Sequence, residues 1–257
     1  TVDGHSKNGT EVEAPALGVE RVHTGANDRV LQGTVLLSRS IVRRERAYGP
    51  SDGIPVAFYC GAGTTGRSYE LWLRLLGRRG LRVCPYSFAV DAYSDDVDHT
   101  CASLLSAADE LAGDLEGPAV MGLSLGADLA FMVANRRSDV RNLVAIATGA
   151  SFARCAWQDR PLRRRLIERG WTLPRLEIAW RELSPEHNLP DGPNRRVRFS
   201  YSAYDRLIGA ANASELAAAL RASGAVVDVR RGHAPGHLAA CAAGLSAPAS
   251  LANALKR

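Results

Sequence analysis

The most informative segment of the chain reads Ala119-Val120-Met121-Gly122-Leu123-Ser124-Leu125-Gly126-Ala127-Asp128-Leu129-Ala130-Phe131. Its first five residues are almost all apolar, which is typical of a central strand covered on both faces. The residues after Ser124 have a helical pattern. Gly122 and Gly126 stand two residues on either side of Ser124, where only a small residue lets a strand and the following helix approach closely. The segment therefore predicts a buried strand, a sharp turn at Ser124 and a helix.

The same alternation continues on both sides of this segment. Short apolar runs alternate with helical patterns, which indicates βαβ units and a parallel sheet. The expected strands are 54–60, 81–86, 119–123, 143–148, 197–202 and 225–230. The expected helices are 68–79, 102–115, 125–135, 214–223 and 247–256, with Ser214 as an N-cap. The run 30–48 alternates in part and predicts an antiparallel edge hairpin. The predicted fold class is α/β, with a mostly parallel central sheet flanked by helices on both faces.

Residues 151–196 interrupt this rhythm. The segment holds several prolines, three of the four tryptophans and many arginines. A chain of 257 residues is typical of one large α/β domain. We therefore predict a single domain over 1–257, with an excursion or small cap at 151–196.

The composition narrows the function classes. Hydrophobic residues make up 46% and charged residues 23%, which are ordinary globular values. No stretch reaches the roughly 18 apolar residues of a membrane helix, and residues 1–24 are polar without a signal core. The net charge is +5, but basic residues are not interleaved with aromatics, so we expect no nucleic-acid binding. Five cysteines without CxxC spacing predict reduced thiols in a cytoplasmic protein. The chain does not begin with Met, so removal of a leader stays open.

Gly122-Leu123-Ser124-Leu125-Gly126 matches the pattern G-x-S-x-G, and its strand–turn–helix context favours Ser124 as a nucleophile. The turn would aim the N–H of Leu125 at the oxygen of a bound carbonyl. A second apolar strand runs into a glycine turn at 56–63, and here the chain resembles the α/β-hydrolase superfamily. The resemblance implies Ala62 as the second N–H donor of an oxyanion hole. Cys60 stands where the family usually has His, which alters the support of the turn and not the backbone donor.

The resemblance also implies an acid and a base, in the order Ser, Asp or Glu, His. Asp205 follows the expected strand 197–202 at the matching position. The base is expected in the loop 231–237, where His233 and His237 compete. We favour His237, because it leaves room for the loop to climb over the sheet edge and is followed by a small apolar helix start. His233 remains the alternative.

Together these residues predict an esterase-like or thioesterase-like serine hydrolase that works through an acyl-enzyme, with no metal or organic cofactor. Acyl transfer, amide or C–C bond cleavage by the same residues stays open, as does a non-catalytic binding protein on this scaffold. The expected partner is a small-molecule acyl substrate. The arginines and tryptophans of 157–181 have two interpretations. One is an amphipathic helix with a solvated basic face. The other is an acyl-pocket wall whose rim attracts an acidic carrier protein.

Overall fold

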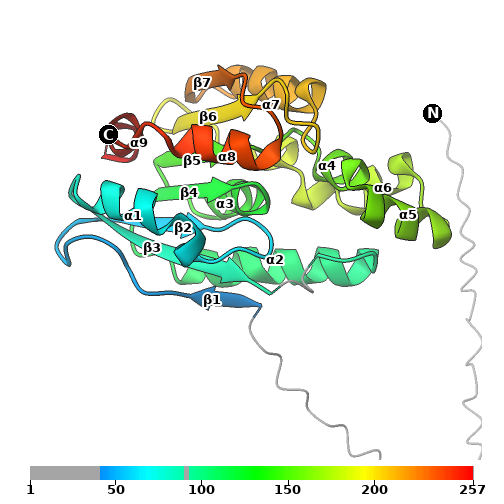
Figure 1. Cartoon of the computed structure of the whole chain (residues 1–257), viewed down its shortest axis with the longest axis horizontal. Coiled ribbons are helices and arrows are strands. Elements are labelled where there is room, and N and C mark those ends of the chain that lie inside the picture. The colour runs from blue at the N-terminus through cyan, green and yellow to red at the C-terminus, as the bar shows by residue number, and fades with distance from the viewer. Residues whose placement is uncertain (1–40, 90–92, 257) are drawn as a thin grey trace, which may run out of the picture. The chain divides into compact units, whose positions relative to one another are not determined.

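The computed structural model of the chain describes residues 41–89 and 93–256, and they form a sheet of seven strands flanked by helices (Figure 1). The strand order is β1-β3-β2-β4-β5-β6-β7. Strand β1 pairs antiparallel with β3, and all other pairs are parallel. The strands are β1 Val42–Arg44, β2 Ile54–Tyr59, β3 Leu81–Phe88, β4 Ala119–Leu123, β5 Asn142–Ile146, β6 Arg196–Ser202 and β7 Val226–Gly232.

Helices cover both faces of the sheet (Figure 1). One face carries α1 (Glu70–Gly77), α8 (His237–Leu245) and α9 (Pro248–Lys256), and the other carries α2 (Val97–Gly113), α3 (Leu125–Arg136) and α7 (Ala210–Ala222). Each face buries its own hydrophobic cluster. Because side chains alternate along a strand, β4 sends Val120 into one cluster and Met121 into the other. The α/β class and the mostly parallel sheet predicted from the sequence are therefore confirmed.

Each of the six predicted strands is present, with ends that differ by one or two residues. The helices needed larger corrections. Helix α7 begins at Ala210 after Gly209, so Ser214 lies inside it and is not its N-cap. Helix α2 begins at Val97, where the Asp96 side chain accepts a hydrogen bond from the His99 N–H. The α2 start depends on a local capping hydrogen bond that periodicity does not reveal, whereas α7 begins after Gly209 without a side-chain cap.

The predicted edge hairpin at 30–48 is found only in part. Its residues 42–44 form the short strand β1, whose partner is β3 and not a neighbouring strand of the same run. Residues 30–40, like the polar segment 1–24, lie outside the described residues. The described residues all fall within one compact unit, Arg39–Arg257, so the start of the predicted 1–257 domain also lies outside the described part.

The excursion between β5 and β6 consists of short helices. They are α4 (Phe152–Gln158), α5 (Arg160–Glu168), α6 (Leu173–Ala179), η3 (Arg181–Leu183) and η4 (Pro185–His187). Trp180 is fully buried among them, and its indole N–H donates to the Val97 carbonyl at 3.0 Å. Leu162 and Leu166 of α5 are also buried, whereas most of its arginines face outwards. This arrangement is the amphipathic packing that the first interpretation of 157–181 describes.

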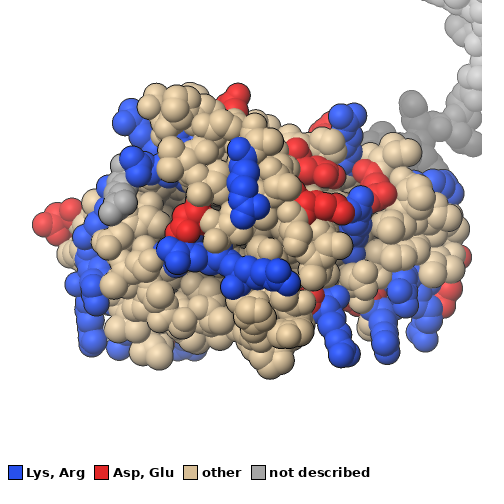
Figure 2. Space-filling model, turned by 90° about the horizontal axis from the view of Figure 1, so that it is seen from above, with Lys and Arg blue, Asp and Glu red and all other residues tan. Residues whose placement is uncertain are grey.

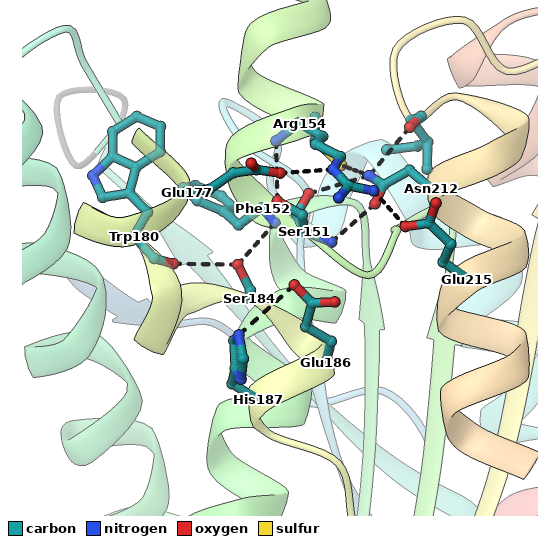
Figure 3. Close-up of polar contacts among 12 residues, drawn as sticks. Ser151, Phe152, Arg154, Glu177, Trp180, Ser184, Glu186, His187, Asn212 and Glu215 are labelled. Carbon is teal, nitrogen blue, oxygen red and sulfur yellow. Dashed lines mark hydrogen bonds and ion pairs between the residues drawn. The ribbon is translucent and has the colours of Figure 1, made fainter. Parts of the chain in front are cut away.

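Polar contacts fix the excursion to α7 (Figure 3). The Arg154 guanidinium lies between the carboxylates of Glu177 on α6 and Glu215 on α7, with Nε 2.7 Å from Glu177 Oε1. The Asn212 amide accepts from the Ser151 N–H at 2.9 Å and donates to the Ser151 carbonyl at 3.1 Å. Asn212 is buried, so its hydrogen bonds give the junction a specific geometry.

Among the described helices, none taken singly has the length and apolarity needed to cross a membrane, and α8 with α9 would pass that test only as a pair bent by 69°.

Candidate active site

Ser124 occupies a strained turn between β4 and α3. Its φ of 52° and ψ of −124° lie in a region that non-glycine residues rarely adopt. A Cβ added to Gly122 would lie 2.1 Å from the Gly126 carbonyl oxygen, and one added to Gly126 would lie 2.1 Å from the Tyr59 carbonyl oxygen. The two glycines therefore permit the close approach of β2, β4 and α3 that holds Ser124 at the end of the strand.

His237 is the first residue of α8, and its ring bridges Ser124 and Asp205. Its Nε2 lies 2.9 Å from Ser124 Oγ, and its Nδ1 lies 2.8 Å from Asp205 Oδ2. His233, the alternative base, is exposed and packs beside the Tyr204 ring at 5.8 Å between centroids. Of these two histidines, the structure thus places His237 next to the serine.

The Asp205 carboxylate is held by both of its oxygens. Oδ2 faces His237, while Oδ1 accepts from the backbone N–H groups of Leu207 at 3.0 Å and Ile208 at 3.2 Å. The residue is only 2% exposed. A buried carboxylate with this set of donors is fixed in orientation, so it can hold the imidazole in one tautomer.

The two proposed oxyanion donors are the backbone N–H groups of Leu125 and Ala62, and Ala62 lines the same pocket as Ser124. Leu125 begins α3, and Ala62 lies in the turn after β2. Neither N–H has an acceptor among the described residues. The turn is supported by Thr64, whose hydroxyl donates to the Gly61 carbonyl at 2.7 Å and lies 2.9 Å from the Tyr69 hydroxyl. Cys60 is fully buried, and burial raises the pKa of its thiol, so the thiol contributes packing here and not charge.

A pocket of about 350 Å³ opens beside Ser124 and His237. Its wall is mainly apolar and comes from η1 (Gly66–Tyr69), α1 and α8. Besides Ser124, His237 and Ala62, the lining includes Tyr69, Trp72, Leu207, Leu238, Cys241, Ala242 and Leu245. The segment 151–196 contributes no residue to this lining. The second interpretation of 157–181, an acyl-pocket wall, therefore does not describe the apolar pocket.

A second cleft, of about 1110 Å³, borders His237 and Asp205 on another side. It is more polar and is lined by Arg160 of α5 and Arg206, which follows Asp205. Both arginines are exposed, and neither forms an ion pair with a described carboxylate. The cleft therefore presents positive charge beside the histidine.

The sequence did not identify two side chains close to this group. Asp128 lies one helical turn after Ser124 in α3 and accepts a hydrogen bond from the Thr148 hydroxyl. Burial raises the pKa of Asp128 to about 8, although the Thr148 hydrogen bond and the charge of His237 partly oppose this effect. Cys241 Sγ lies 4.0 Å from His237 Nε2. An acidic residue within an apolar helix was the only sequence signal for Asp128.

The pKa of His237 reflects opposing effects. Burial is the largest single effect and lowers it, but the hydrogen bonds and charges of Asp205 and Cys241 together outweigh burial, so the pKa is raised. A raised pKa indicates that the site stabilises the protonated imidazolium. A serine, a histidine and a carboxylate in this order can transfer a proton from the hydroxyl to the ring as the hydroxyl attacks an electrophile.

Solved structures share this fold. A hyperthermophilic esterase from the archaeon Pyrobaculum calidifontis is similar with a TM-score of 0.57 and 19% identity, covering 84% of this chain and 79% of that one. A lipase in its open form is similar with a TM-score of 0.56 and 14% identity, covering 82% of this chain and 94% of the lipase chain. A thermophilic carboxylesterase cloned from a metagenomic library is similar with a TM-score of 0.54 and 21% identity, covering 84% of this chain and 85% of the carboxylesterase chain.

No protein-family model matches the sequence, and no curated protein matches it either. The structural similarity and the sheet topology together show that the chain has the α/β-hydrolase fold.

Proposed function

We propose that the protein is a serine hydrolase that cleaves a carboxylic ester or thioester. The observation that carries the proposal is the hydrogen-bonded chain Ser124–His237–Asp205 at the mouth of an apolar pocket. The esterase and lipase activities of proteins with the same fold support ester hydrolysis as the reaction class. The pocket beside Ser124 would hold the acyl chain, because its wall is mainly apolar.

The reaction would proceed in two halves. Ser124 Oγ attacks the carbonyl carbon while His237 Nε2 takes the hydroxyl proton, and the N–H groups of Leu125 and Ala62 stabilise the oxyanion. The carbon–oxygen or carbon–sulfur bond then breaks, and His237 gives its proton to the leaving group. Water next attacks the acyl-enzyme while His237 takes a proton of the water. The bond between the acyl carbon and Ser124 Oγ then breaks, and His237 returns its proton to Ser124 Oγ as the carboxylic acid is released.

A fluorophosphonate probe tests this proposal directly. We expect the probe to label the protein and the Ser124→Ala variant to remain unlabelled. A panel of p-nitrophenyl esters with increasing acyl length should then show hydrolysis that is lost in the same variant. The absence of both labelling and hydrolysis in the folded wild-type protein would favour a binding protein on this scaffold.

We further propose that the leaving group carries negative charge and lies in the second cleft. His237 must reach the leaving group to protonate it, and this cleft borders His237. Arg160 and Arg206 would supply complementary charge. An acyl thioester of a phosphorylated carrier, either a cofactor or an acidic carrier protein, has both the apolar chain and the anionic leaving group that this pair of cavities would accommodate.

A further inference from the structure

A third cavity lies at the β7 side of the sheet, far from Ser124 in the fold. It has a volume of about 330 Å³ and lies between β6, β7 and α9. Its lining includes Arg196, the first residue of β6. Arg196 pairs with Asn142 at the beginning of β5, and Asn142 pairs with Ala119 at the beginning of β4. Ser124 follows the other end of β4. The cavity therefore extends from the N-terminal ends of the parallel strands, opposite the edge that carries the candidate active site.

Arg198 is the buried cation of this cavity. The residue is 8% exposed, and its NH1 donates to Ser250 Oγ at 2.6 Å. Its Nε is buried and has no hydrogen-bond partner. No described carboxylate forms an ion pair with it. A guanidinium that is taken out of water without an ion-pair partner destabilises the folded protein, and burial lowers the pKa of Arg198. The positive charge of Arg230 adds to this effect, and the negative charge of Asp228 only partly opposes it.

The surrounding side chains offset this charge only in part. Arg196 is exposed and unpaired, and Arg230 is engaged by Asp228, with Nε 2.8 Å from Oδ1. Asp228 is the only acid in the lining, so the three arginines leave the cavity with two excess positive charges. Figure 2, which views the molecule from the side of β7, shows basic side chains across the middle of this face with an acidic one beside them.

The cavity is rich in hydrogen-bond donors as well as in positive charge. Ser250 and Asn253 of α9 add a hydroxyl and an amide to the guanidinium groups. Planar guanidinium groups bind the oxygens of phosphate and carboxylate groups through charge-assisted, often bidentate, hydrogen bonds. Arg196, Arg198 and Arg230 all line the cavity, so an oxyanion bound there would lie beside these arginines.

We propose that this cavity is a binding site for a small oxyanion, namely a phosphate or carboxylate group of a small molecule. The ligand supplies counter-charge for the three arginines, which Asp228 alone does not balance. The cavity volume of about 330 Å³ leaves room for an organic substituent next to the anionic group. The site is independent of the proposed hydrolysis, because it lies at the other end of the strands.

Thermal unfolding in a HEPES and NaCl buffer, with increasing inorganic phosphate at constant ionic strength, tests the proposal. We expect the Tm of the wild-type protein to rise and to saturate, because a ligand that binds only the folded state stabilises it. Without phosphate, Arg198→Met should be at least as stable as the wild type, because it removes a buried charge that is only partly compensated. Arg198→Met should also lose the phosphate response, while Arg221→Met, an exposed arginine on α7, keeps it.

Parallel titrations with citrate and with glycerol phosphate distinguish the source of the anion. A stronger response to citrate points to a carboxylate ligand, and a stronger response to glycerol phosphate points to a phosphorylated one; either supports the site. If Arg198→Met does not fold, Arg196→Gln replaces it, with an expected several-fold loss of phosphate affinity by calorimetry. A wild-type response that matches NaCl alone, or a phosphate response unchanged in the variants, would overturn the proposal.

Discussion

The Nε2 atom of His237 lies 2.9 Å from the Oγ atom of Ser124, although 113 positions separate the two residues along the chain. Ser124 stands at the start of α3 and His237 at the start of α8, so two helix N-termini meet at this contact. Asp205, at the end of β6, approaches the opposite side of the ring. Three segments from the C-terminal edge of one sheet thus build a single hydrogen-bonded chain.

The first prediction concerns the base. His237→Ala should reduce kcat for a p-nitrophenyl ester by about a thousandfold or more, because the serine hydroxyl then lacks a proton acceptor. His233→Ala should reduce it by less than about threefold, because His233 is exposed and packs on Tyr204. Circular dichroism of both variants checks that the fold is kept. If the two variants behaved in the opposite way, His233 would be the base.

The second prediction concerns pH. The base must be neutral to accept a proton, so kcat/KM should rise with pH as His237 loses its proton. Because the pKa of His237 is raised, the inflection of this acid limb should lie above the usual 6.5. Asp205→Asn removes the hydrogen bond that raises it, so the inflection should move to lower pH while kcat falls by orders of magnitude. An inflection that is the same in both proteins would show that Asp205 does not control the charge of His237.

The third prediction concerns Asp128 and stability. Burial raises its pKa to about 8 from the usual 3.8, so between these values the folded chain holds a proton that the unfolded chain has lost. The contribution of Asp128 to the free energy of unfolding should therefore fall as pH rises through this window, by at most about 1.4 kcal/mol per pH unit.

Asp128→Asn removes this titration and keeps an oxygen for the Thr148 hydroxyl. The variant should match the wild type near pH 4 and exceed its stability increasingly towards pH 8, as measured by urea unfolding at each pH. The exposed Asp52→Asn change is the control and should leave the pH profile unchanged. A constant difference between Asp128→Asn and the wild type would refute the raised pKa.

The fourth prediction concerns the serine turn. Gly126→Ala should destabilise the protein severely, by about 3 kcal/mol or more, because the new Cβ would lie 2.1 Å from the Tyr59 carbonyl oxygen. Gly113→Ala at the end of α2 is the matched control, since no atom lies within 4 Å of its Cβ position. That change should be neutral or slightly stabilising. Chemical denaturation of both variants measures the difference, and equal stabilities would contradict the proposed close approach.

The fifth prediction concerns the leaving group. The double change Arg160→Gln and Arg206→Gln removes two guanidinium groups from the cleft beside His237. It should raise KM for an acyl-CoA by about tenfold, because the anionic leaving group loses complementary charge. The value of kcat/KM for the neutral acyl-N-acetylcysteamine should stay nearly unchanged. High salt should likewise raise the KM of the wild-type protein for the acyl-CoA and have little effect on the neutral thioester. Arg221→Gln is the control for net charge. Equal effects on both thioesters would reject the anionic leaving group but leave the hydrolase proposal intact.

The excursion shows why some features could not be predicted. Its prolines, tryptophans and arginines indicated a break in the strand–helix rhythm, and that break is present. Whether its tryptophans lined a substrate pocket depended on neighbours that are distant in sequence. Trp180 packs under Tyr93 and Phe152 and donates to Val97, whereas Trp72, outside the excursion, lines the apolar pocket. Composition gives no information about which side a buried ring faces.

The sequence by itself determined the alternation of strands and helices, because periodicity follows from local backbone geometry. It also determined the turn at Ser124, because Gly122 and Gly126 satisfy a steric requirement that lies within one short segment. Tertiary structure alone shows which of His233 and His237 lies beside Ser124, because the path of the 231–237 loop depends on contacts such as the Ser202 hydroxyl to the Ala234 carbonyl. It also decided the charge state of Asp128 and the unpaired state of Arg198, because burial and counter-charge are properties of the packed chain.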